Sequence, residues 1–496
     1  MSLSVALQVA QSALAARQTE TSTVSRNIAG AQDAGYSRKS VLLSAVVSDS
    51  GQSGGIRTEG IGRVTDNALY TSLLRSTSVG TSQEAVLEGL ETLAQTFGDT
   101  ELEQSPAALL GDLKTALQNA SSDPNDTILA QDLLNSAKDM VDVLQRSSSA
   151  VQTVRADADA AIANSVDQVN KLLGQLEDLN TIIVKGTQSG HDVTDAQDSR
   201  DQVLLALSEE MGITTLTRAD GDVVVYTDSG VTLFETSARE VSFAPTNTFS
   251  AATVGNAVFV DGVPVVGDDA VMPLSSGRLH GLTELRDEVA PTYQSQLDEI
   301  ARGLIESFAE SDQSGGGGPD QAGLFTWSGA PAVPVTATLS VGLAADIQIN
   351  ANADPDQGGD LDLLRDGGIS DPLDPDYDYN PTDLAGYTGR YQDFLDGLDA
   401  PRVFDAGVDL DPTDTLTGFA SSSVSWLESN RQTATSDLEI QSVIVNRTAE
   451  SLANTTGVNI DEEMTLLLDI ERAYAAASKL ISAVDAMLDD LLAVAR

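Results

Sequence analysis

Residues 457–496 read GVNIDEEMTLLLDIERAYAAASKLISAVDAMLDDLLAVAR and carry the pattern that decides the fold. The apolar positions alternate in steps of four and three, and they are Leu466, Ile470, Ala473, Ala477, Leu480, Val484, Met487, Leu491 and Val494. A heptad repeat of this kind gives a helix with one apolar side, which a partner helix must cover along its whole length. The sequence therefore predicts a long C-terminal helix and requires a second helix beside it.

The N-terminus supplies a matching helix. Its apolar residues follow the same spacing at Leu3, Leu7, Ala10, Leu14, Val24 and Ile28. The charges of the two ends are opposite, because residues 458–496 hold eight acids and three bases whereas residues 1–75 hold five acids and seven bases. Segments of opposite charge attract each other. We therefore predict that the two ends pair as a coiled coil.

Further helices are predicted between the ends. Residues 82–185 are almost free of helix breakers, except at Ser-Ser-Asp-Pro 121–124, where one helix should stop and another begin. Residues 279–310 and 420–455 also have helical patterns. Long helices that lie far apart in the sequence indicate a discontinuous helical bundle.

The middle of the chain has a different pattern. Apolar and polar residues alternate over 213–275, with turn signals at Asp228-Ser229-Gly230 and at Asp261-Gly262. Residues 354–414 are rich in turns and contain seventeen aspartates. The fold class expected is mainly α, with a β-rich, Asp-rich outer region inserted into the helical stem.

Three domains follow from these patterns. Residues 1–35 and 455–496 would form the terminal coiled coil. Residues 36–190, 278–312 and 415–454 would form the helical domain. Residues 191–277 and 313–414 would form the outer region.

Composition excludes several functions. Lys and Arg number 27 against 75 Asp and Glu, a net charge of −48 that repels the phosphates of nucleic acids. The chain has no cysteine and only two histidines, His191 and His280, which excludes thiolate and His-rich metal sites. No stretch approaches the roughly 18 apolar residues that a membrane-spanning helix needs. The N-terminus lacks the basic start of a cleaved signal peptide. We predict no catalytic, cofactor-binding or metal-binding residues, and no enzyme activity.

Two segments resemble a known family. Residues 25–38, SRNIAGAQDAGYSR, are similar to the N-terminal signature S-N-N-I-A-N-x-N-T-P-G-Y-S-R of bacterial flagellar axial proteins, and the departures include Arg26, Gly30 and Ala34. The order Val458–Glu463 followed by Ala473-Tyr474 resembles the hook-associated protein 1 (FlgK) family. Residues 276–282, SGRLHGL, agree with that family too.

The resemblance implies a structural part of the flagellum that assembles between hook and filament. The subunit would leave the cell through the flagellar type III apparatus without a cleaved signal, and act outside the cell. Implied partners are the hook protein, the second junction protein and filament, further copies in a homo-oligomeric ring, and an export chaperone on the C-terminal helix. The residues expected at the assembly interface are Leu3, Leu7, Leu14, Asn27, Gly35, Tyr36, Arg38, Ile470, Tyr474, Leu480, Val484, Met487 and Leu491.

Other interpretations stay open at this point. Within the flagellar proteins, the hook protein and the second junction protein share the terminal pattern. From other classes, the Asp-rich stretch is compatible with a Ca²⁺-dependent surface adhesin. A secreted hydrolase would need two carboxyl groups about 5–10 Å apart, and the sequence offers no candidate pair.

Overall fold

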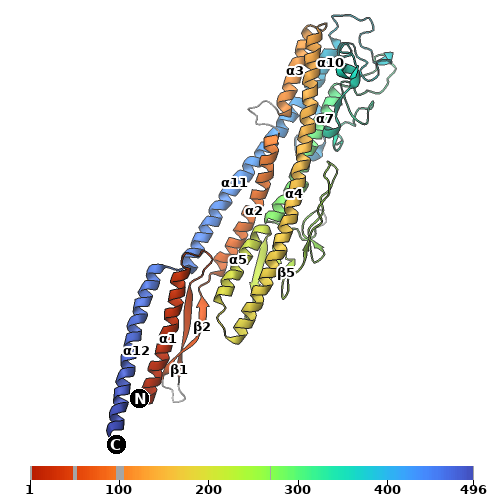
Figure 1. Cartoon of the computed structure of the whole chain (residues 1–496). Coiled ribbons are helices and arrows are strands. Elements are labelled where there is room, and N and C mark those ends of the chain that lie inside the picture. Colours follow the sequence, from red (N-terminus) through yellow and green to blue (C-terminus); the bar gives the residue numbers. More distant parts are fainter. Residues whose placement is uncertain (1–2, 48–52, 97–104, 268–269, 495–496) are drawn as a thin grey trace.

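The protein is an elongated molecule in the computed structural model, which describes residues 3–47, 53–96, 105–267 and 270–494. Both ends of the chain lie at the same tip of the molecule (Figure 1). Helices dominate, and the strands form five small sheets in the described ranges. The mainly helical class predicted from the sequence is therefore confirmed.

The tip consists of two helices and a hairpin, here called the terminal unit. Helix α1 (Leu3–Gly30) and helix α12 (Ile460–Val494) pack side by side and run in opposite directions (Figure 1). Strands β1 (Lys39–Val47) and β2 (Ser53–Arg63) form an antiparallel hairpin that packs on α1. The predicted pairing of the chain ends is confirmed. The hairpin was not predicted, because residues 39–63 fall in a range expected to be helical.

The rod above the tip is built from long helices. These are α2 (Asn67–Thr96), α3 (Pro106–Ser122), α4 (Thr127–Ser189), α5 (Thr194–Glu210) and α11 (Leu416–Thr456). The boundary expected at Ser-Ser-Asp-Pro 121–124 is confirmed between α3 and α4. Local chemistry fixes α4 at both ends, because Asp126 accepts a hydrogen bond from the Ile128 amide and Gly190 adopts the left-handed conformation that closes the helix.

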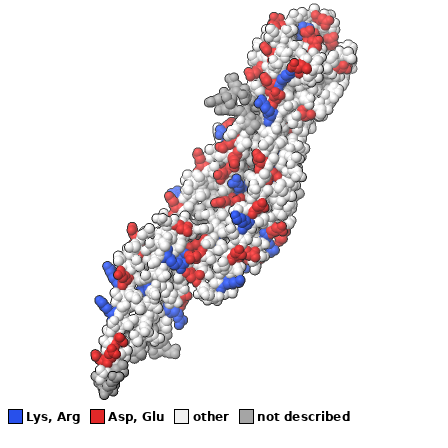
Figure 2. Space-filling view, viewed as in Figure 1, with Lys and Arg blue, Asp and Glu red and all other residues white. Residues whose placement is uncertain are grey.

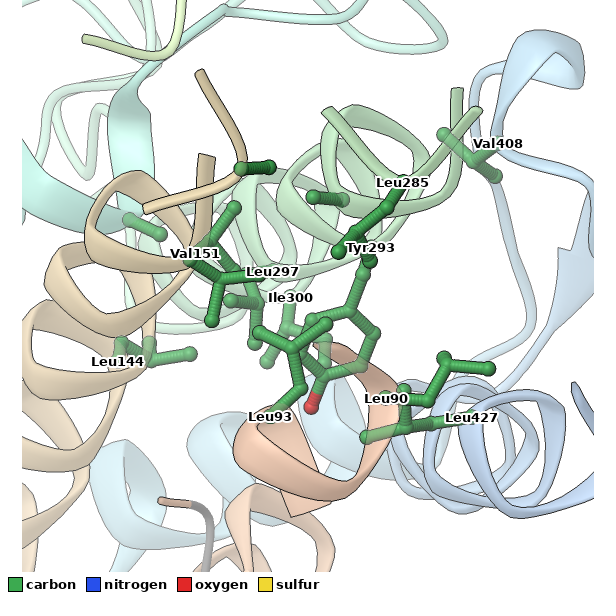
Figure 3. Packing of buried hydrophobic residues seen from close by; sticks show 14 of the residues in the cluster. Leu90, Leu93, Leu144, Val151, Leu285, Tyr293, Leu297, Ile300, Val408 and Leu427 are labelled. Atoms are coloured by element: carbon green, nitrogen blue, oxygen red, sulfur yellow. The ribbon is translucent and has the colours of Figure 1, made fainter. Parts of the chain in front are cut away.

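One further helical stretch crosses the centre of the rod. Helix α6 (Arg278–Glu284) continues through a π-helical turn, η2 (Leu285–Val289), into α7 (Ala290–Ser307). Side chains from several helices meet around Tyr293 of α7 in a buried core (Figure 3). The core residues drawn around it include Leu90, Leu93, Leu144, Val151, Leu297, Ile300 and Leu427. This shared core joins α2, α4, α7 and α11 into one rod.

Two three-stranded sheets lie along the rod. The first contains β3 (Ile213–Thr217), β4 (Val223–Thr227) and β5 (Thr232–Phe234), and the second contains β6 (Val241–Ser242), β7 (Phe259–Val260) and β8 (Val263–Pro264). Both predicted turns lie where expected, between β4 and β5 and between β7 and β8. Asp261 and Gly262 both have positive φ angles, as a tight hairpin turn requires.

Residues 309–415 lie mainly at the end of the molecule away from the tip, beside α3 and the start of α4 (Figure 1). Their strands β9 (Phe325–Thr326), β10 (Gln348–Ile349), β11 (Arg402–Val403) and β12 (Thr413–Asp414) are only two residues long. Helices α8 (Leu343–Asp346), α9 (Leu363–Asp366) and α10 (Gly389–Asp399) lie between them, with the 3-10 turns η3 (Ala351–Ala353), η4 (Pro355–Gln357), η5 (Pro375–Tyr377) and η6 (Ala406–Val408). Regular strand is thus scarcer here than the sequence predicted. The physical reason is that aspartates such as Asp354, Asp374 and Asp405 cap the short turns with their own side chains.

Candidate assembly surface

Three of the predicted residues meet where α1 ends and α12 begins. Asn27 is buried in the last turn of α1, and the chain then folds back so that Tyr36 returns to it. Gly30 permits this return, because a Cβ at that position would lie 2.6 Å from Cδ2 of Tyr36. The absence of a side chain at residue 30 thus sets the path of the loop.

Asn27 uses every polar position of its side chain. Its Nδ2 donates to the Lys39 carbonyl (2.9 Å) and to Glu463 Oε2 (3.1 Å). Its Oδ1 accepts from the Lys39 amide (3.0 Å) and the Tyr36 hydroxyl (3.1 Å). Buried polar atoms with all partners present hold one conformation strongly. Asn27 therefore fixes the start of β1 on the end of α1.

Arg38 connects the loop before β1 to the first turn of α12. Its Nε donates to Oε1 of Glu463 over 2.7 Å, and its backbone amide donates to the Thr456 carbonyl at the end of α11. The Glu463 side chain is 0% exposed, whereas Arg38 stays about a third exposed. We call Asn27, Tyr36, Arg38 and Glu463 the polar node. It joins the end of α1, the start of β1 and the first turn of α12.

Sequence reasoning missed Glu463. It is one of three consecutive acids, Asp461-Glu462-Glu463, in the first turn of α12. Acids are favourable at this end of a helix whether they point inward or outward. Asp461 and Glu462 are exposed while Glu463 points inward. The partner that makes burial possible lies more than 400 positions away, so no local pattern could single out this acid.

Gly35 lies close by but faces a different helix. A Cβ at Gly35 would lie 1.5 Å from Nε2 of Gln202, which belongs to α5. The residue thus marks the close approach of the loop to the rod, outside the polar node.

The predicted seam of α12 divides into two columns. Ile470, Ala477 and Val484 are buried and form the column that faces α1. Beside it, the heptad-spaced positions Leu466, Leu480 and Met487 remain exposed. Leu480 is 60% exposed, against 7% for Val484. We call these two sets the closed column and the open column.

The other predicted interface residues differ in their exposure to solvent. Tyr474 of α12 is exposed, and Leu3, Leu7 and Leu14 of α1 are half-buried. The hairpin covers another side of α1, where Ser12 Oγ accepts a hydrogen bond from the Ile56 amide. Leu491 lies within α12, but its side chain is outside the described part of the structure. The predicted residues of α1 and α12 therefore lie on one helix pair, but Tyr474, Leu480 and Met487 remain exposed.

The described residues contain little that resembles a catalytic or metal-binding site. His280 Nδ1 lies 3.0 Å from the Ser82 hydroxyl and 3.7 Å from Glu284. Both neighbours approach the same ring nitrogen, so they cannot form the relay in which the acid and the serine use opposite nitrogens. Among the same residues, no group of three or more His, Asp or Glu could hold a metal, and no helix is both long and apolar enough to cross a membrane.

Comparison with known sequences gives two matched segments. Residues 87–324 match the profile described as the flagellar hook-associated protein FlgK helical domain. Residues 452–494 match the flagellar basal body rod FlgEFG protein C-terminal profile. The first match covers most of the rod, and the second covers α12.

Curated relatives carry a consistent name. Flagellar hook-associated protein 1 of Escherichia coli is 26% identical over 65% of this chain and 60% of its own length. The protein of the same name from Bacillus subtilis is 24% identical over 98% of this chain and 97% of its own. The match thus spans only about 60% of the Escherichia coli relative.

A solved structure shares the fold. The flagellar hook junction protein FlgK from Burkholderia pseudomallei superposes with a TM-score of 0.56 at 12% identity. The superposition covers 77% of this chain and 99% of the other. At this identity the likeness concerns the arrangement of the elements.

Proposed function

This chain belongs to the flagellar hook-associated protein 1 (FlgK) family, and from that premise we propose that it is a structural junction protein, assembled between hook and filament through its terminal helices. The names of its relatives, hook-associated and hook junction protein, support this position. No described feature favours the adhesin or hydrolase alternatives.

The observation that carries the proposal is the open column of α12. A partner helix in a coiled coil covers both columns of a heptad seam, whereas α1 buries only the closed column of α12. Leu466, Leu480 and Met487 form a second apolar column that the described part of the chain leaves exposed. Exposed apolar rows of this length mark protein contacts. Because the heptad spacing runs along the helix, the matching occupant is another helix.

We propose that the occupants are the terminal helices of neighbouring copies in a ring. Contacts of this kind are heterologous, with each copy giving one surface and receiving another. Hook protein on one side, and the second junction protein and filament on the other, would continue the stack. Before export, a chaperone would cover the same open column and prevent aggregation.

The proposal includes the remaining expectations from the sequence. The interface residues predicted on α1 and α12, together with the polar node, would shape the inner contacts. The division into terminal unit, helical rod and outer region would correspond to three domains. The role is structural rather than enzymatic, and the site of action is the flagellum outside the cell.

Two substitutions on α12 separate the functions of its columns. Val484→Asp places a charge in the closed column and should break the α1–α12 pair. Leu480→Asp changes only the open column, so the pair should survive while assembly fails. Ala475→Asp adds the same charge at an exposed position on the side of α12 away from both columns and is the matched control.

Motility and electron microscopy of hook–basal bodies provide the measurement, with circular dichroism of the purified chains as a check on folding. We expect Leu480→Asp cells to lack filaments while the purified chain keeps its helical content. Normal filaments on Leu480→Asp cells would refute the open column as the assembly surface. A loss of filaments with Ala475→Asp would show that added charge alone blocks assembly.

A further inference from the structure

Four aspartates stand at every third position where α5 begins. Asp192 precedes the helix and accepts hydrogen bonds from the amide and hydroxyl of Thr194, while the other three lie on successive turns. Between them lie three basic side chains that come from the terminal unit, one from α1, one from β1 and one from β2. In spatial order the members are Asp192, Arg26, Asp195, Lys39, Asp198, Arg63 and Asp201. We call this set the charge ladder.

Each basic residue of the ladder bridges two aspartates. Arg26 contacts Asp192 over 2.7 Å and Asp195 over 2.8 Å. Lys39 forms an ion pair with Asp195 and another with Asp198, the latter over 3.2 Å.

Arg63 completes the ladder with Asp198 (3.1 Å) and Asp201 (2.6 Å). Ser37 adds its amide (3.3 Å) and its hydroxyl (2.5 Å) as donors to Asp198. Every rung therefore connects the terminal unit with the rod.

The Lys39–Asp198 pair of the ladder is buried, whereas Asp195 beside it is exposed to solvent. The Lys39 side chain is 0% exposed and that of Asp198 is 8% exposed, whereas Asp195 is largely in solvent. Burial lowers the pKa of Lys39, but the hydrogen bonds and charges of Asp195 and Asp198 outweigh it and leave the pKa raised. Lys39 also lies 3.7 Å from the centroid of the Tyr36 ring. Removing both Lys39 and Arg63 leaves the buried Asp198 carboxylate without a cation, which is far costlier than losing an exposed pair.

Only two stretches of chain link the terminal unit to the rod. Residues 64–66 lead from β2 into α2, and residues 457–459 lead from α11 into α12. Two links define an axis about which the unit could turn. Helix α5 lies on the other side of the hairpin from α12 (Figure 1), so contacts to α5 resist that rotation.

We propose that the charge ladder is an electrostatic clasp that fixes the orientation of the terminal unit on the rod. With the clasp closed, a load on the terminal helices passes through the hairpin into α5. With the clasp open, the unit pivots on its two links while α1 and α12 stay paired. This inference goes beyond the proposed function and holds for the isolated chain, whatever it assembles with.

Distances between spin labels test the clasp directly, because the chain has no native cysteine. Labels at Gln18→Cys in α1 and Gln188→Cys in α4, both exposed, report the orientation of the unit. Labels at Gln118→Cys and Lys171→Cys report the rod alone, and Gln18→Cys with Lys479→Cys reports the α1–α12 pair. We expect a single narrow distance distribution for all three pairs in the parent chain.

The double variant Lys39→Met/Arg63→Met should lose the narrow peak for Gln18–Gln188 and keep it for the other two pairs. The matched control is Arg472→Met, which removes an exposed ion pair with Asp469 on α12 and should change nothing. Lys39→Met/Arg63→Lys keeps the charge at residue 63 and should narrow the Gln18–Gln188 peak relative to the double variant.

A narrow Gln18–Gln188 peak in the double variant, with the rod distance intact, would overturn the clasp. If the double variant also loses the rod distance, the milder variant Arg26→Gln/Arg63→Gln decides the question. Broadening confined to Gln18–Gln188 in that variant supports the clasp, and an unchanged peak contradicts it.

Discussion

At the scale of single residues, the polar node depends on one buried carboxylate. Glu463→Gln keeps the shape of the side chain but removes the charge that Arg38 contacts over 2.7 Å. Arg38 is partly exposed, so water can replace part of what is lost. We expect a local loss of about 1–2 kcal/mol, which is about 5- to 30-fold in an equilibrium constant. Hydrogen exchange at the Lys39 amide, which donates to Asn27, should accelerate by that factor.

The adjacent residue provides the control. Glu462→Gln removes the same charge from the same first turn of α12, so any effect on the helix dipole is common to both variants. Glu462 is exposed, and its substitution should leave exchange at Lys39 nearly unchanged. Equal acceleration in the two variants would mean that the node gains nothing from the burial of Glu463.

At the scale of elements, one glycine sets the distance between α2 and α6. A Cβ at Gly281 would lie 2.2 Å from the backbone oxygen of Ser82, so an added methyl group forces the two helices apart. Gly281→Ala should lower the free energy of unfolding by about 1–3 kcal/mol. Gly174→Ala in α4 has no atom within 4 Å and should instead raise it by about 0.5–1 kcal/mol.

Urea denaturation of the two variants measures this difference. The same chemical change is made in two helices, and only the surroundings differ. Opposite signs are the expected result. Destabilisation by both substitutions would show that helix contact at Gly281 is not the cause.

The sequence predicts helices better than it predicts short strands, for a physical reason. The steps of four and three in α12 repeat over five turns or more, so chance interruptions do not hide them. The hairpin of β1 and β2 has no such signal, because Ser and Gly are frequent in residues 48–62 and five residues, rather than two, separate the strands. The hairpin at Asp261-Gly262 was predicted from its two-residue turn signal.

The candidate site was predictable only in part. Asn27, Tyr36 and Arg38 come from one short motif, and the structure does bring them together with α12. The roles of Glu463 and the aspartates of α5 cannot be predicted from the sequence, because their burial depends on basic residues supplied by distant segments. The open and closed columns of α12 also merge into one stripe until the position of α1 is known.

At the scale of the whole molecule, charge is distributed unevenly. Residues 1–66 and 457–496 hold thirteen acids and nine bases, a net charge of −4, which leaves −44 on residues 67–456. Acidic side chains are spread over the visible face of the rod and its far end, with fewer basic ones among them (Figure 2). Copies brought together through their terminal units would therefore attract at the apolar columns and repel along the rods.

This balance predicts that self-association strengthens with salt. Raising the ionic strength from 0.01 M to 1 M shortens the screening length from about 30 Å to about 3 Å, which removes most repulsion between exposed charges. Apolar contacts in the open column are not weakened by the added salt, and the buried centre of the charge ladder is screened less than exposed pairs. Sedimentation velocity of the purified chain should thus show larger species as NaCl increases, and Leu480→Asp should stay monomeric throughout. Oligomers that dissociate on adding salt would mean that ion pairs between copies, rather than apolar columns, hold the assembly together.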